Sequence, residues 1–129
     1  MVAAVFVIGA TPKIAGDCAA ELANRLARAN VSGPVAGSGM LPGGRAGLYV
    51  AYLLDQPWYG DKPQARPADF QASGARLVIA VRGSELAGAL AEDGAFADLD
   101  SRLFAGPAEA AQFPLKAFEV PAPRVAPDP

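Results

Sequence analysis

The sequence lacks histidine and contains a single cysteine, Cys18. Without histidine, neither a Ser-His-Asp triad nor a Cys-His dyad can form, and nearly every catalytic zinc arrangement loses its usual ligand. One cysteine excludes an internal disulfide and a cysteine-based zinc site. Its position in a helical pattern favours a small core residue over a nucleophile. We therefore predict no catalytic residue, no metal site and no cofactor.

Clusters of positive charge are also missing. The 11 Lys and Arg residues are scattered along the chain and are outnumbered by 13 Asp and Glu residues, which gives a net charge of −2. Nucleic-acid-binding proteins and polybasic membrane surfaces need basic residues that gather on one face. The composition therefore predicts no nucleic-acid partner and no electrostatic membrane patch, and it does not determine the oligomeric state.

No apolar run is long enough to cross a membrane. The opening run, residues 2–10, is nine residues long, whereas a spanning helix needs about 20. It has no preceding basic stretch and no small-residue cleavage site, so a secretory signal is not expected. The chain as given is predicted to be soluble. Two interpretations of the run remain open: a buried first strand, or the trailing end of a transmembrane helix.

The chain does contain enough apolar sequence for a core. Hydrophobic residues make up 52% of its 129 residues and charged residues 19%, which is typical of one folded domain. We place this domain at residues 1–120. Residues 121–129 carry four prolines and are predicted to be an extended or disordered tail.

Apolar periodicity predicts strands that alternate with helices. Strands are expected at residues 2–8, 35–36, 58–61, 77–81 and 115–120, and helices at residues 15–29, 48–54, 66–73 and 85–93, with short helical pieces at residues 96–104. Crossovers of this length place neighbouring strands in parallel. The expected fold class is α/β, a small three-layer sandwich with a mostly parallel sheet of four or five strands.

A glycine-rich loop is the first candidate site. Gly37, Ser38 and Gly39 follow a predicted strand and precede a predicted helix. Glycines there could let a phosphate or a sugar approach the backbone amides. The spacing matches neither the dinucleotide fingerprint nor a P-loop. A plain flexible connection is the competing interpretation.

Trp58, Tyr59 and Asp61 form the second candidate. Aromatic rings stack on the apolar face of a sugar, and a nearby carboxylate accepts hydrogen bonds from its hydroxyls. The alternative is that the two rings close one end of the core and leave their polar tips in water. Together with the glycine loop, these residues are the expected contacts for a saccharide.

Other charged residues are interpreted as solvated. The acidic residues at positions 92–93 and 98–100 lie in or beside helical segments that we expect to be exposed. Paired carboxylates perform acid–base chemistry only where burial separates their pKa values. Arg82 and Arg102 could contact an anion, but we expect their side chains to be solvated as well.

Several stretches resemble the soluble C-terminal part of bacterial multi-spanning membrane glycosyltransferases, which are related to protein mannosyltransferases and lipid A aminoarabinose transferases. The resemblance covers residues 15–120 and is carried by residues 33–39, 47–54, 57–60, 74–84 and 113–120. It is a pattern of similar segments rather than a signature motif. It implies an α/β appendage that follows the last membrane helix.

Members of that family transfer a sugar from a polyprenyl-phosphate donor. Their catalytic acidic residues lie in loops near the N-terminus, and this sequence has no counterpart of that region, so no catalytic residue is carried over. The resemblance implies a non-catalytic accessory domain on the extracytoplasmic face of the membrane, attached through an upstream region and contributing to acceptor or sugar recognition. The competing hypothesis is a free-standing cytoplasmic α/β domain that binds a small ligand or a protein partner.

Overall fold

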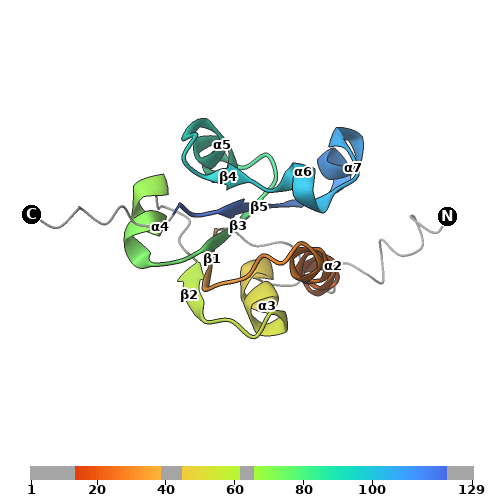
Figure 1. Cartoon of the computed structure of the whole chain (residues 1–129), viewed down its shortest axis with the longest axis horizontal. Helices are drawn as coiled ribbons and strands as arrows, with labels where there is room; N and C mark the ends of the chain where they lie inside the picture. The colour runs from red at the N-terminus through yellow and green to blue at the C-terminus, as the bar shows by residue number, and fades with distance from the viewer. Residues whose placement is uncertain (1–13, 39–44, 62–65, 122–129) are drawn as a thin grey trace, which may run out of the picture.

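The computed structural model describes residues 14–38, 45–61 and 66–121. Helices and strands alternate along these ranges (Figure 1). In chain order they are α2 (Ile14–Arg28), β1 (Val35–Ser38), α3 (Ala46–Leu53), β2 (Trp58–Asp61), α4 (Pro67–Ser73), β3 (Leu77–Val81), α5 (Glu85–Glu92), β4 (Ala97–Asp98), α6 (Asp100–Leu103), α7 (Pro107–Gln112) and β5 (Leu115–Glu119). The predicted strand at residues 2–8 and the predicted tail from residue 122 onward lie outside the described residues.

The five strands form one open mixed sheet in the order β2-β1-β3-β5-β4. The α/β class is confirmed. β1 pairs in parallel with both β2 and β3, whereas β5 pairs antiparallel with both β3 and β4. The expectation of a mostly parallel sheet is therefore met only by β2, β1 and β3.

The reversal of β5 follows from where the chain re-enters the sheet. After β3, the chain passes through α5, β4, α6 and α7 and returns at the carboxyl end of β3, where the Arg82 N–H donates to the Pro114 carbonyl at 2.8 Å. From there β5 can only run back along β3, so that Val81 pairs with Leu115 and Leu77 with Glu119. The sequence predicted short helical pieces at residues 96–104, but residues 97–98 pair with β5 as β4.

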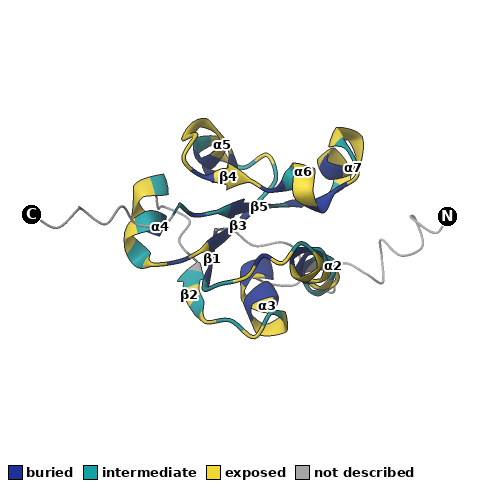
Figure 2. Cartoon of the chain, in the orientation of Figure 1, coloured by how far each residue is buried: buried dark blue, intermediate teal, exposed yellow. Residues whose placement is uncertain are grey.

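Alternation along β1 and β3 divides the core between the two faces of the sheet. Val35, Leu77 and Ile79 face α2 and α3, whereas Ala36 and Val78 face α4 and α5. Figure 2 shows buried residues on the inner sides of the helices and exposed residues on their outer sides. The core lies on both faces of β3, whose first four residues are all buried, which is typical of an apolar strand covered by helices on both sides.

Local signals explain where the helices begin and end. The Ser84 hydroxyl accepts a hydrogen bond from the Ala87 N–H at 3.2 Å and caps the start of α5, as an N-cap serine is expected to do. α4 ends at Gly74, which adopts the left-handed conformation with φ 86°. No helix within the described ranges is both long and apolar enough to span a bilayer.

Candidate functional site

The predicted glycine and aromatic residues lie on two neighbouring strands. Gly37 is on β1 and pairs with Asp61 on β2, so both lie toward the carboxyl ends of parallel strands. Ser38 is the last residue of β1 and pairs with Ala80 on β3. Gly39 lies outside the described residues, and the side chains of Ser38 and Asp61 are not described. The structure thus brings Gly37, Ser38 and Asp61 to one edge of the sheet.

Trp58 and Tyr59 lie on opposite faces of that sheet. The Trp58 indole packs against Gly37 and Gly47, and a Cβ at either glycine would come within 2.9 or 2.8 Å of the ring. The Tyr59 ring lies near Gly74, at the end of α4, and this residue is 38% exposed. Trp58 is packed against the core on the α3 side. The two rings therefore do not form one stacking platform, and Tyr59 is the more accessible of them.

Three side chains that the sequence placed on solvated segments, Arg82, Asp98 and Asp100, meet Lys116 beside the carboxyl end of β3. We call Arg82, Asp98, Asp100 and Lys116 the paired charge cluster. Arg82 binds Asp100 in a bidentate fork, with Nη1–Oδ2 at 2.9 Å and Nη2–Oδ1 at 3.0 Å. Lys116 Nζ lies 2.6 Å from Asp98 Oδ2 and 2.9 Å from Asp100 Oδ2. Two cations thus meet two carboxylates. The solvated interpretation is wrong for Arg82 and Asp100, whose side chains are only 18% and 22% exposed, whereas Asp98 is exposed, as predicted.

Arg82 also fixes the backbone where β5 begins. Its Nε donates to the Phe113 carbonyl at 2.6 Å and its Nη2 to the Leu115 carbonyl at 3.0 Å. With the fork to Asp100, the guanidinium bonds three segments that are distant in sequence. A guanidinium whose donors are committed in this way holds the fold together and has little left for a ligand.

The pKa values of the cluster follow from its pairing. Partial burial alone would raise the pKa of Asp100, but hydrogen bonds from Arg82 and Lys116 and their positive charges hold that pKa below its ordinary value of 3.8. Burial alone would lower the pKa of Lys116, but the hydrogen bonds that Lys116 donates to Asp98 and Asp100, together with the negative charges of these carboxylates, raise that pKa above its ordinary value of 10.5. Both groups are therefore held in their charged forms near neutral pH.

A cleft opens beside this cluster, and we call it the β3 cleft. Its volume is about 380 Å³, and it is lined by Arg82, Asp100, Ser101, Phe104, Ala105, Gly106, Pro107, Ala110 and Ala111. Most of these are small or apolar residues of α6, α7 and the turn between them. A volume of this size lies at the lower end of the range of about 300–1,000 Å³ found for small-molecule sites. The charged pair forms one end of an otherwise mainly apolar lining.

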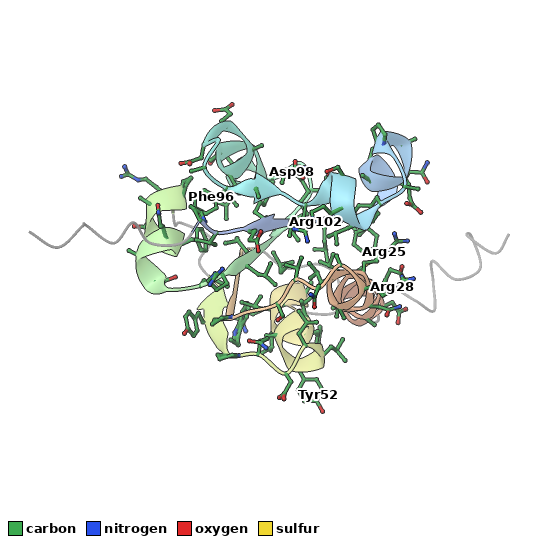
Figure 3. The ribbon with its side chains drawn as sticks, viewed as in Figure 1. Arg25, Arg28, Tyr52, Phe96, Asp98 and Arg102 are labelled. Carbon is green, nitrogen blue, oxygen red and sulfur yellow. The ribbon has the colours of Figure 1, made fainter. Side chains whose placement is uncertain are left out.

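A second, more polar hollow lies where α2 faces α6, and we call it the arginine hollow. Its volume is about 250 Å³, and it is lined by Arg25, Arg28, Ala29, Arg102 and Leu103. Figure 3 labels the three arginines, two from α2 and one from α6. The sequence placed Arg102 in a solvated class and did not single out Arg25 or Arg28 as ligand contacts. No sequence signal could have joined them, because Arg102 is more than seventy positions from Ala29, whose carbonyl it contacts.

Phe104 lies between the two hollows. Its ring packs against Phe113 with centroids 5.2 Å apart. The Arg25 guanidinium lies 4.9 Å from the centre of the ring and that of Arg82 lies 6.0 Å from it, distances at which cation–π attraction operates. The Phe104 ring therefore lies between Arg25 of the arginine hollow and Arg82 of the β3 cleft.

The remaining reactive group is Cys18 on α2. Burial raises the pKa of the Cys18 thiol above its ordinary value of 9.0, and the nearby Asp17 charge raises it further. A thiol with a raised pKa forms little thiolate at neutral pH and is a poor nucleophile. Within residues 14–38, 45–61 and 66–121, no three Cys, Asp or Glu side chains come together as metal ligands would.

Comparison of the chain with protein families, with curated proteins and with solved structures gave no match.

Proposed function

We propose that this chain is a non-catalytic binding domain that recognises a saccharide as the accessory part of a membrane glycosyltransferase with a polyprenyl-phosphate sugar donor. The observation that carries the binding role is the β3 cleft, which combines a mainly apolar wall with the Asp100 carboxylate, held in place by Arg82 and able to accept hydrogen bonds from hydroxyls. Sugar sites combine these two elements, an apolar surface for the ring and oriented polar groups for its hydroxyls. The glycosyltransferase context rests on the similarity of sequence segments described above.

The position of the cleft in the sheet supports this role. β2 lies on one side of β1 and β3 lies on the other. The strand order therefore has a topological switch point between β1 and β3. Ligands of open α/β sheets bind outside the carboxyl ends of the strands at such a point. Arg82 directly follows β3 and lines the cleft, whereas the other lining residues come from α6, α7 and the turn between them. The cleft therefore lies beside the carboxyl end of β3 rather than between β1 and β3.

Tyr59 and the end of β1 remain a second proposed contact for the same ligand. Tyr59 is exposed on β2, and Gly37, Ser38 and Asp61 lie at the carboxyl ends of the neighbouring strands. In the glycosyltransferase context, the domain lies on the extracytoplasmic face of the membrane and contacts the membrane through an upstream region. Outside that context, we place it in the cytoplasm.

Saturation-transfer NMR with a panel of glycans and a polyprenyl-phosphate sugar tests the proposal. Ala111 is exposed on α7 and lines the β3 cleft, whereas Ala108 is exposed on the same helix and does not line it. We expect Ala111→Phe to abolish saccharide signals and Ala108→Phe to leave them unchanged. Tyr59→Ser reports on the second contact. Absence of saccharide signals for the unmodified chain across the panel would refute the binding role.

A protein partner is the second candidate function, for one specific reason. α3 exposes Leu48, Tyr49, Tyr52 and Leu53, and Tyr52 is 79% exposed. Adjacent exposed apolar side chains of this kind mark interaction sites on soluble domains. Size-exclusion chromatography with light scattering tests self-association through this face, and we expect Tyr52→Ser with Leu53→Ser to shift any oligomer toward monomer.

At the level of fold, we propose a small three-layer sandwich. α2 and α3 form one outer layer and α4 and α5 the other, on the basis of the two core clusters that these helices share with the sheet. β2, β1 and β3 are its parallel part.

A further inference from the structure

We propose that the arginine hollow binds a phosphate group carried by a ligand, through Arg25, Arg28 and Arg102. This site is separate from the saccharide contacts proposed above and does not depend on them. Three guanidiniums from two helices line one hollow of about 250 Å³. Such a space is large enough for a phosphate and its first attached atoms, and too small for a large ligand to be enclosed.

Arg28 is the arginine of the hollow whose positive charge has no partner among the described residues. It is exposed in the last turn of α2, and no ion pair or hydrogen bond within residues 14–38, 45–61 and 66–121 engages its side chain. Arginines in a last turn often balance the negative end of the helix dipole. Here Arg102 already donates Nη2 to the Ala29 carbonyl at 3.1 Å, so that end of α2 has a positive partner from α6.

Arg25 is held in place and retains donors for a ligand. Its Nε donates to Glu21 at 2.6 Å and its Nη1 to the Leu103 carbonyl at 2.7 Å, while its guanidinium lies over the Phe104 ring. Its Nη2 lies 3.6 Å from Glu109, too far for a hydrogen bond. A side chain that is already ordered loses little further entropy when a ligand binds.

Arg102 is oriented in the same way. Its Nη2 is engaged by Ala29, and its Nη1 lies 3.9 Å from Glu119, a pair that is too long for a direct hydrogen bond. Arg25 and Arg102 are thus held in place, Arg28 engages no other described residue, and all three arginines line the hollow. A phosphate accepts from several directions through its tetrahedral oxygens, whereas one guanidinium is sufficient to satisfy a planar carboxylate. The arrangement therefore favours phosphate.

A phosphate group could reach the hollow on a small molecule or on a lipid headgroup. The probes are inorganic phosphate, followed by heteronuclear NMR of the arginine side chains, and vesicles of phosphatidylcholine with or without phosphatidic acid, followed by flotation. Neither probe contains a sugar, so failure of saccharide binding leaves this test unaffected. Flotation only with phosphatidic acid, abolished by Arg28→Gln, would assign the source to a lipid, and saturable binding of inorganic phosphate would assign it to a small molecule.

Two variants and a matched control decide the outcome. We expect Arg28→Gln and Arg102→Gln each to weaken binding by about tenfold. Arg66→Gln removes the same charge at the exposed start of α4 and should change binding by less than about twofold. Arg102→Gln could perturb the packing of α6 against α2. Arg28 is exposed, so Arg28→Gln is not expected to perturb packing and tests the proposal independently. Failure of both probes to bind, or equal weakening by Arg66→Gln, would overturn the proposal.

Discussion

The paired charge cluster and the arginine hollow use the same residue types in opposite ways. In the cluster, Arg82 makes four hydrogen bonds, to one carboxylate and two backbone carbonyls. In the hollow, Arg28 is exposed and engages no carboxylate that the structure records. The first arrangement stabilises the fold. The second leaves the positive charge of Arg28 available to a ligand, while Arg25 and Arg102 of the hollow lie near Glu21, Glu109 and Glu119. The difference lies in how many donors are committed, and residue type alone does not reveal it.

Among the substitutions that distinguish the paired charge cluster from the arginine hollow, Arg82→Gln is expected to have the largest effect on stability. The substitution leaves Asp100 without its fork and two carbonyls without a donor, in a site where the Arg82 side chain is only 18% exposed. We expect the free energy of unfolding to fall by about 3 kcal/mol, measured by urea denaturation. Arg82→Lys keeps the charge but cannot form the fork and should recover only part of that loss. A loss below about 1 kcal/mol for Arg82→Gln would mean that the cluster is not structural.

Removal of the central carboxylate should have the next largest effect. Asp100→Asn leaves the partly buried Arg82 and Lys116 without their shared charge, and we expect a loss of about 2 kcal/mol in the free energy of unfolding. Among the described residues, Asp98 forms an ion pair with Lys116 alone and is 43% exposed. Its Oδ1 also accepts from the Asp100 N–H at 2.9 Å, and asparagine keeps this acceptor. Asp98→Asn therefore serves as the control, with a loss of about 0.5 kcal/mol. Equal losses for the two variants, in the same urea assay, would contradict the central role of Asp100.

The pH dependence of stability should sharpen the same comparison. The pKa of Asp100 is lower in the folded chain than its ordinary value of 3.8, so the unfolded state binds more protons as the pH falls through this region. The stabilisation from Asp100 is therefore complete above the unfolded pKa and is lost as the pH falls through the folded pKa. We expect Asp100→Asn to lose less stability than the unmodified chain between pH 7 and pH 3. Parallel curves for the two proteins would rule out this contribution.

The smallest effect on stability is expected in the arginine hollow. Arg28→Gln removes an exposed side chain that makes no hydrogen bond or ion pair with another described residue. The free energy of unfolding should therefore change by less than about 0.5 kcal/mol. Thermal or urea unfolding measures this change. A loss comparable with that of Arg82→Gln would show that Arg28 is structural, and the contrast between the two groups would disappear.

The local elements of the fold were predicted well because their signals are local. The stripe in residues 15–29 predicted α2, and the run Leu77–Val81 predicted β3 with the bounds that the structure has. The predicted helices at residues 66–73 and 85–93 agree within one residue with α4 and α5, which Gly74 and Ser84 cap. β4 was missed because alanine and aspartate have little strand propensity. These two residues form a strand because they pair with β5.

The candidate sites were predicted less well. The sequence grouped Trp58 with Tyr59 because they are adjacent, but adjacent residues of a strand point to opposite faces, and Trp58 packs against Gly37 and Gly47. Asp98, Asp100 and Arg82 were assigned to solvent because each was considered on its own segment. Their pairing joins residues that are 16 to 18 positions apart, and no helical or strand period relates such residues.

The sequence by itself determined the α/β class, most of the helices and strands, and the absence of histidine chemistry. These features depend on composition and on neighbours within a few positions. Only the tertiary structure decided that β5 runs antiparallel to β3, that Arg82 is consumed by pairing, and that Arg28 and Arg102 share one hollow. The physical reason is that an arginine is structural or available according to which carboxylates and carbonyls the fold brings to it, and those partners come from distant parts of the chain.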